Sequence, residues 1–241
     1  MANNAHHHMH ERPALLLTRP QSSAEAFVSQ LDPAVMTGVT VLISPLLEIV
    51  PTHAAIAWGG YRGVIFTSAH APACVADATR LPAYCVGART AETAQQRGWD
   101  VRLVAQTAED LLTQVDQVDG PLLHIAGAHR RGEIADRLSA RGMPTDVVVA
   151  YQQPEQPLSQ AALDLLTGPV PVVAPLFSPR TAMLFAEQIK SAANLHVVAM
   201  SAAVVEALGD ITPESVQTAA IPTGTEMRRC VENLLSGATL P

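Results

Sequence analysis

Small residues with hydroxyl groups, together with glycines, follow several apolar segments of this chain and could bind an anion. In "GVIFTSAHA" (63–71), β-forming residues lead directly into Thr67 and Ser68 and then into a helical run. The N–H groups that open a helix are uncovered at such a position, and with the helix dipole they attract negative charge. The residues placed in this way are Thr67, Ser68, Gly87, Thr90, Gly127, Ser178 and Ser201. They predict a site for a ligand that carries several negative charges.

The same residue types also serve as ordinary helix caps, each of which stabilises its helix by about 1 kcal/mol. For any single junction, a cap is the simpler interpretation. The recurrence of the junction in two sets favours a ligand site, because the carboxyl ends of parallel strands are where open α/β sheets bind ligands. Two domains that face each other with these edges would form a cleft lined by N–H and hydroxyl donors.

The elements that must position these residues are apolar strands, each followed at once by a helix. Their strands lack the alternation of a half-exposed sheet, which is typical of parallel strands covered on both faces. Strands that alternate with helices indicate βαβ units and an α/β fold. The junctions fall in six segments, at 14–20, 63–71, 84–94, 121–138, 172–186 and 196–208.

The order of the segments indicates an internal repeat. Residues 63–115 and 172–235 look like copies of one module, each ending in a helix-start signal. The segments that precede them also match each other, as strand, helix, strand and extended tail. The chain therefore consists of two doubly wound α/β domains, and the tails near 45–51 and 149–156 are placed to cross between them. Periodicity alone does not decide whether the strand–helix–strand segment at the start of the chain shares a domain with residues 63–115 or with residues 172–235.

Composition excludes several classes of protein. The 241 residues are 48% hydrophobic and 15% charged, which suits a folded core rather than a disordered chain. A formal net charge of −7 argues against a nucleic-acid surface, and no apolar run is long enough to cross a membrane. Three scattered cysteines do not form a disulfide framework, so we expect free thiols and a cytoplasmic location. Residues 1–11, rich in histidine, are expected to be disordered or tag-like.

The motifs of common cofactor enzymes do not occur. No G-x-G-x-x-G follows a strand, and there is no P-loop, H-E-x-x-H or G-x-S-x-G motif. We therefore expect no cofactor and no metal. Fourteen of the fifteen basic residues are arginine, which suits bidentate contacts to carboxylates but also follows from a GC-rich genome.

These pieces, in this order, resemble the uroporphyrinogen-III synthase family. The resemblance runs from about residue 13 to residue 236. Each motif alone is weak because it consists largely of small residues, but the ordered set is specific. The segments that carry it are "LLLTRP", "GVIFTSAHA", "CVGARTAETAQQRGW", "LLHIAGAHRRGEIADRLSARGMPTDVVVAYQQ", "FSPRTAMLF" and "VVAMSAAVVEAL".

The resemblance implies a domain organisation that periodicity leaves open. The first domain would be discontinuous, formed by 12–44 plus 157–241, and the second would be inserted as 53–148. Segments 45–52 and 149–156 would form a two-stranded hinge between the two parallel-sheet domains.

The resemblance also implies an activity and its residues. Family members close linear hydroxymethylbilane into uroporphyrinogen III without a cofactor, losing water and inverting the last pyrrole ring. The substrate's eight carboxylates suit a donor-lined cleft. The family's binding positions fall on the seven residues named above, with Arg19 as a carboxylate partner and Arg130 or Arg131 as weaker ones. Its candidate acid falls on Tyr151 in "VAYQQ", where packing is the competing interpretation.

Some residues depart from the family pattern. Where some members have Gly-Pro-Thr-Thr, this chain has "SAAVVEAL", in which only Ser201 keeps a hydroxyl. His129 is unexpected and is interpreted as a solvated loop residue. Two rival functions remain open: a two-domain sensor of a small anion without activity, and a cofactor-dependent transferase or reductase. The partner expected here is a linear tetrapyrrole bound by a monomer, with no nucleic acid and no membrane.

Overall fold

The computed structural model describes residues 13–75, 81–115, 118–129, 133–189 and 193–237. The chain forms two compact units, one from Met1–Glu48 with Glu155–Pro241 and the other from Ile49–Pro154. It therefore passes between the units within the segments 45–52 and 149–156 that the sequence expects to link two domains. The predicted tag-like segment 1–11 lies outside the described residues.

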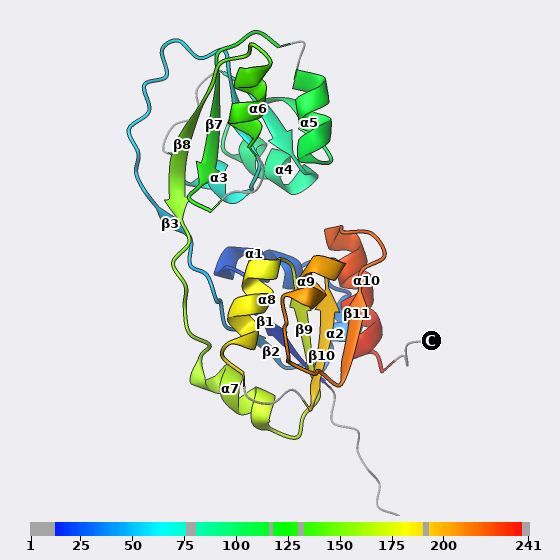
Figure 1. The fold of residues 1–241 in the computed structure, drawn as a ribbon. Helices are drawn as coiled ribbons and strands as arrows, with labels where there is room; N and C mark the ends of the chain where they lie inside the picture. The colour runs from blue at the N-terminus through cyan, green and yellow to red at the C-terminus, as the bar shows by residue number, and fades with distance from the viewer. Residues whose placement is uncertain (1–12, 76–80, 116–117, 130–132, 190–192, 238–241) are drawn as a thin grey trace, which may run out of the picture. The chain divides into compact units, whose positions relative to one another are not determined.

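Unit 1 is built around a five-stranded parallel sheet with the order β11-β10-β9-β1-β2 (Figure 1). Strand β1 lies between β2, which follows it in the chain, and β9, which follows more than a hundred residues later. The sequence order thus reverses between β1 and β9. The elements are β1 (Ala14–Leu17), α1 (Gln21–Val28), α2 (Pro33–Met36), β2 (Val41–Ile43), α7 (Gln160–Thr167), β9 (Val172–Leu176), α8 (Pro179–Ala186), β10 (Leu195–Ala199), α9 (Ala202–Glu206), β11 (Ser215–Thr218) and α10 (Gly224–Leu235).

Unit 2 contains a six-stranded sheet with the order β3-β8-β7-β4-β5-β6, in which only β3 is antiparallel to its neighbour. The chain order reverses between β4 and β7. The elements are β3 (Val50–Pro51), β4 (Gly63–Phe66), α3 (His70–Ala73), β5 (Pro82–Val86), α4 (Ala88–Gln96), β6 (Asp100–Ala105), α5 (Ala108–Gln114), β7 (Leu122–Gly127), α6 (Ile134–Ala140) and β8 (Thr145–Gln152).

Each sheet is covered by helices on both faces, which explains its uninterrupted apolar strands (Figure 1). In unit 1, Leu16 faces the layer of α7, α8 and α9, whereas Leu15 and Leu17 face α1 and α10. In unit 2, Phe66 packs with residues of α3 and α4, whereas Ile65 packs with residues of α5 and α6. The predicted α/β class with parallel sheets is confirmed.

All six predicted junctions are a strand followed by a helix, namely β1–α1, β4–α3, β5–α4, β7–α6, β9–α8 and β10–α9. The predicted helix starts also occur: Thr107 forms a capping box on α5, and Thr223 caps α10. The edge strands β6 and β11 were not predicted from the sequence. Exposed and half-buried residues alternate through β11 and through much of β6, so neither strand is a continuous apolar run.

None of the helices in the described part of the chain is long and apolar enough to cross a membrane.

Candidate functional site

The predicted binding residues of unit 2 gather at the carboxyl edge of its sheet, around the point where the strand order reverses. Ligands of open α/β sheets bind at such switch points. Thr67 and Ser68 follow β4, and Gly127 ends the neighbouring strand β7. Gly87 follows β5, the neighbour of β4 on the other side. The structure thus brings together within one unit residues that lie up to sixty positions apart.

The two hydroxyls after β4 contact residues of two different strands, β7 and β8. Thr67 Oγ1 lies 3.1 Å from Nε2 of His124, a residue of β7. Ser68 is hydrogen-bonded to the phenol of Tyr151 on β8, and its Oγ also accepts a hydrogen bond from the N–H of His70 at 3.3 Å. The N-cap residue of α3 is Ala69, which has no side chain that could cap the helix, so only Ser68 reaches a helix-start N–H.

Tyr151 lies inside the sheet of unit 2, because β8 continues to Gln152. Its side chain is 4% exposed and packs in the same core cluster as Phe66. The ring of His70 meets it edge to face, with the ring centroids 5.9 Å apart. Burial raises the pKa of the Tyr151 phenol above its ordinary value, while the hydrogen bond with Ser68 acts in the opposite direction. The phenol is therefore protonated at neutral pH.

Gly127 has a packing role in this arrangement. A Cβ atom built on it would lie 2.6 Å from Cε2 and Cζ of Tyr151 and 2.8 Å from its hydroxyl oxygen. No side chain fits there unless the ring moves. The glycine at this strand end is therefore explained by the close approach of Tyr151.

Gly87 and Thr90 belong to the start of α4. Gly87 has a φ of 84°, in the region that favours glycine, and its N–H donates to the carbonyl of Ala105 at 2.8 Å. That N–H is thus used inside the sheet. No side chain caps α4, and Thr90 is buried within its first turn.

In unit 1 the predicted residues lie at the corresponding edge. Arg19 follows β1, and its guanidinium carbon lies 3.8 Å from the centre of the Phe177 ring, which follows β9. Phe177 in turn meets Phe27 edge to face, with centroids 5.3 Å apart. The stack holds the guanidinium at the switch point between β1 and β9. Arg19 is half-buried.

The two serines of unit 1 differ. Ser178 accepts a hydrogen bond from the N–H of Thr181 at 3.2 Å and caps α8, with its Oγ also 2.9 Å from Thr181 Oγ1. Ser201 precedes α9, but its side chain makes no capping hydrogen bond. Helix capping therefore explains the serine at position 178. It does not explain the serine at position 201.

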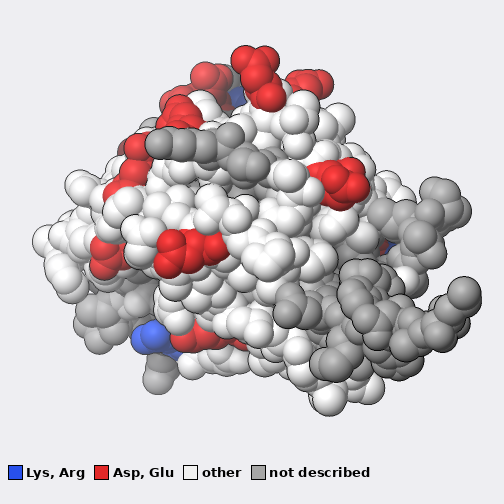
Figure 2. Space-filling model, turned by 90° about the horizontal axis from the view of Figure 1, so that it is seen from below, with Lys and Arg blue, Asp and Glu red and all other residues white. Residues whose placement is uncertain are grey.

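With a net charge of −7, the protein as a whole does not attract anions. Figure 2 shows a surface on which Asp and Glu side chains are spread widely and Lys and Arg are sparse, in keeping with the net charge of −7. Attraction of an anion must therefore come from local donors. Within the described residues, no three His, Cys, Asp or Glu side chains form a group that could hold a metal ion.

A sequence profile described as uroporphyrinogen-III synthase HemD matches residues 34–228. The chain belongs to the uroporphyrinogen-III synthase family. The fold agrees with this membership. The structure resembles a uroporphyrinogen-III synthetase from Helicobacter pylori 26695 with a TM-score of 0.64 and 14% identity, covering 92% of this chain and 99% of that one. It also resembles a mutant uroporphyrinogen III synthase from the extremely thermophilic bacterium Thermus thermophilus, with a TM-score of 0.52, 15% identity and coverage of 92% and 98%. No curated protein matches the sequence.

Several residues around the site of this uroporphyrinogen-III synthase were not predicted. They are Thr18, His70, His124 and Phe177. Only His124 leaves a clear signal in the sequence, as one polar residue within the apolar run "LLHIAG". The weaker candidates Arg130 and Arg131 lie outside the described residues, and His129 is exposed as expected for a loop residue.

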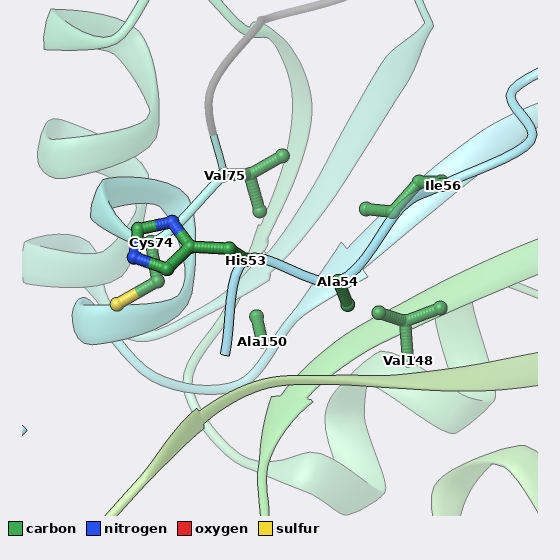
Figure 3. A pocket seen from close by; sticks show the side chains of 7 residues that line it. All are labelled: His53, Ala54, Ile56, Cys74, Val75, Val148 and Ala150. Carbon is green, nitrogen blue, oxygen red and sulfur yellow. The ribbon is translucent and has the colours of Figure 1, made fainter. Parts of the chain in front are cut away.

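Unit 2 contains a small hollow that none of the predicted residues lines (Figure 3). Its volume is about 120 Å³, whereas pockets for drug-sized ligands measure about 300–1,000 Å³. It is lined by His53, Ala54, Ile56, Cys74, Val75, Val148 and Ala150. Burial raises the pKa of the Cys74 thiol, with Arg97 acting in the opposite direction. The hollow is too small for a tetrapyrrole and offers no activated thiol.

The contrast between the two serines of unit 1 can be measured. Ser178→Ala removes a cap and should lower the free energy of unfolding by about 1 kcal/mol. Ser201→Ala removes no capping bond and should change it by less than about 0.5 kcal/mol. Urea titrations followed by circular dichroism compare the two variants. Equal losses would contradict the difference in capping.

Proposed function

We propose that this chain closes hydroxymethylbilane to uroporphyrinogen III, with loss of water and inversion of ring D. The observation that carries the proposal is the family match over residues 34–228, within which most of the predicted binding residues fall. The hydrogen-bond donors near the two points where strand order reverses, between β1 and β9 and between β4 and β7, support it. The linear substrate carries eight carboxylates, which hydroxyl, N–H and guanidinium donors suit.

Arg19 is the strongest carboxylate ligand in this proposal. An arginine fork binds a carboxylate with two parallel hydrogen bonds, and the stack on Phe177 limits the orientations of the guanidinium. The remaining contacts are assigned to the polar groups at the strand ends, namely Thr67, Ser68, Gly87, Thr90, Gly127, Ser178 and Ser201.

The chemistry asks for one proton and a fixed substrate shape. The hydroxyl on ring A takes a proton and leaves as water, which generates an electrophilic azafulvene. The substituted α-carbon of ring D attacks the methylene carbon that carried this hydroxyl, and a spiro intermediate forms. The bond between the spiro carbon and the methylene that joined ring D to ring C then breaks. That methylene bonds to the other α-carbon of ring D, which loses its proton. Water is the only product besides the macrocycle, so no oxidant or reductant is needed.

Tyr151 is the proposed source of the first proton. Its phenol is protonated at neutral pH because burial raises its pKa. Ser68 is hydrogen-bonded to it and is only half-buried, so it lies at the accessible side of the phenol. The substrate also closes spontaneously, to the symmetric isomer, so the larger task of the protein is to hold the chain in the shape that leads to inversion.

The proposal includes a monomeric, cofactor-free protein in a reducing compartment such as the cytoplasm. Cys74, Cys85 and Cys230 are free thiols, which supports such a compartment.

The test is incubation of the purified protein with hydroxymethylbilane, followed by oxidation and chromatographic separation of the uroporphyrin isomers. We expect isomer III, whereas buffer alone gives isomer I. Isomer I alone with the folded protein would overturn the proposal and favour a sensor that binds an anion without reaction.

A further inference from the structure

A buried histidine lies beneath the switch point of unit 2. All six residues of β7 are buried, and His124 is 1% exposed among leucine, isoleucine and alanine. Burying a polar ring costs free energy unless it is hydrogen-bonded. Its Nε2 lies 3.1 Å from Thr67 Oγ1, so the contact joins β7 to the end of β4 across the switch point.

The fold does not need this histidine, because unit 1 builds the same junction without it. Ile65 pairs with His124 in unit 2, and Thr67 follows Ile65 by two residues. In unit 1, β9 is the counterpart of β4 and β1 is the counterpart of β7. Continuing the register of Val173 with Leu15 places Thr18 beside Leu176, and Ser178 follows Leu176 by two residues. Thr18 thus occupies the position that corresponds to His124, and Ser178 the position that corresponds to Thr67.

The counterpart of this pair in unit 1 shows what the histidine supplies. Thr18 is 1% exposed, and its Oγ1 has no hydrogen-bond partner among the described residues. Ser178, the counterpart of Thr67, uses its hydroxyl to cap α8. Thr67 is likewise half-buried, but it caps no helix and its hydroxyl is held by His124.

The direction of the hydrogen bond determines what Thr67 can offer to a ligand. A threonine hydroxyl has one hydrogen to donate and two lone pairs. If Nε2 carries the proton, it donates to Oγ1 and leaves the hydroxyl hydrogen for another acceptor. If Nε2 is unprotonated, the threonine hydrogen is used on the imidazole and only lone pairs face outward. An anion is attracted by the first arrangement alone.

We propose that His124 is a positioning residue whose Nε2–H donates to Thr67 Oγ1 and directs the Thr67 hydroxyl hydrogen toward a carboxylate of the substrate. This inference rests on the proposed function. It assigns to His124 an effect on substrate binding, exerted only through Thr67.

The test is a double-mutant cycle in steady-state closure assays with hydroxymethylbilane. His124→Phe and Thr67→Val should each raise KM about fivefold with little change in kcat, the scale of one hydrogen bond. The double variant should be no worse than Thr67→Val, since both changes remove one interaction. His124→Gln, whose amide can donate at a similar reach, should bring KM back to within about twofold of the unaltered protein.

Losses that multiply in the double variant, or an unchanged KM in a folded His124→Phe, would overturn the assignment. Thermal melts establish whether each variant is folded. If His124→Phe unfolds, ¹⁵N NMR of the unaltered protein decides: a protonated Nε2 supports the proposal and an unprotonated one overturns it. Failure of the unaltered protein to form isomer III would instead overturn the proposed function.

Discussion

Gly127→Ala is expected to lower the free energy of unfolding of unit 2 by about 3 kcal/mol, the upper end of the usual cost of overpacking a core. The added Cβ would lie 2.6 Å from two ring carbons of Tyr151, which is itself packed on core residues. The ring has to move, and its hydroxyl then loses its place beside Ser68. Chemical denaturation monitored by tyrosine fluorescence and circular dichroism measures the loss.

Gly59→Ala is the matched control for this prediction. It lies in the same unit, and a Cβ there would meet nothing within 4 Å. Its effect should stay within about 0.5 kcal/mol. Adding Tyr151→Leu to Gly127→Ala should recover part of the lost stability, because the smaller side chain leaves room for the methyl group. Equal stability of the two single glycine variants would refute the packing role of Gly127.

Tyr151→Phe is expected to slow closure by about 10- to 100-fold, the low end of what a positioned proton donor contributes. The low end applies because the departing hydroxyl leaves readily by itself. The ring is retained, so the fold and the KM should change little. As the enzymatic reaction slows, spontaneous closure competes and isomer I should accumulate beside isomer III. Steady-state rates and isomer ratios measure both effects.

Tyr84→Phe provides the control for loss of a buried phenol. Tyr84 lies on β5 in the same sheet, is 6% exposed, and burial raises the pKa of its phenol as well. It packs on the opposite face, among residues of α5 and α6, away from Ser68. We expect an unchanged closure rate. If Tyr151→Phe also closes the substrate at the full rate, Tyr151 is a packing residue only.

Local sequence patterns were sufficient for the order of elements. Uninterrupted apolar runs such as 14–17 identify buried parallel strands, because helices cover both faces and no polar alternation is required. Thr107 and Thr223 mark the starts of α5 and α10, because a cap depends only on residues within one turn. The edge strands β6 and β11 were not predicted, because each has a neighbour on one side only and its side chains alternate between half-buried and exposed.

The candidate site was predicted in its residue types but not in its contacts. Thr67, Ser68 and Gly127 stood out because small and hydroxylated residues at strand ends are characteristic of ligand sites in this fold class. The sequence did not show that Gly127 makes room for Tyr151, or that Ser178 serves as a cap while Ser201 does not. Those roles depend on side-chain directions, which residue type alone does not specify.

The sequence by itself determined the α/β class, the six strand–helix junctions and the resemblance that identified the family. Only the tertiary structure decided which strands are neighbours, and hence that β1 lies beside β9 and β4 beside β7. The contact of Thr67 with His124 joins residues separated by 57 positions, and the stack of Arg19 on Phe177 spans an even longer stretch of chain. Caps and periodicity are local and are therefore visible in one segment at a time. Contacts across a switch point arise from the packing of whole sheets, which no single segment encodes.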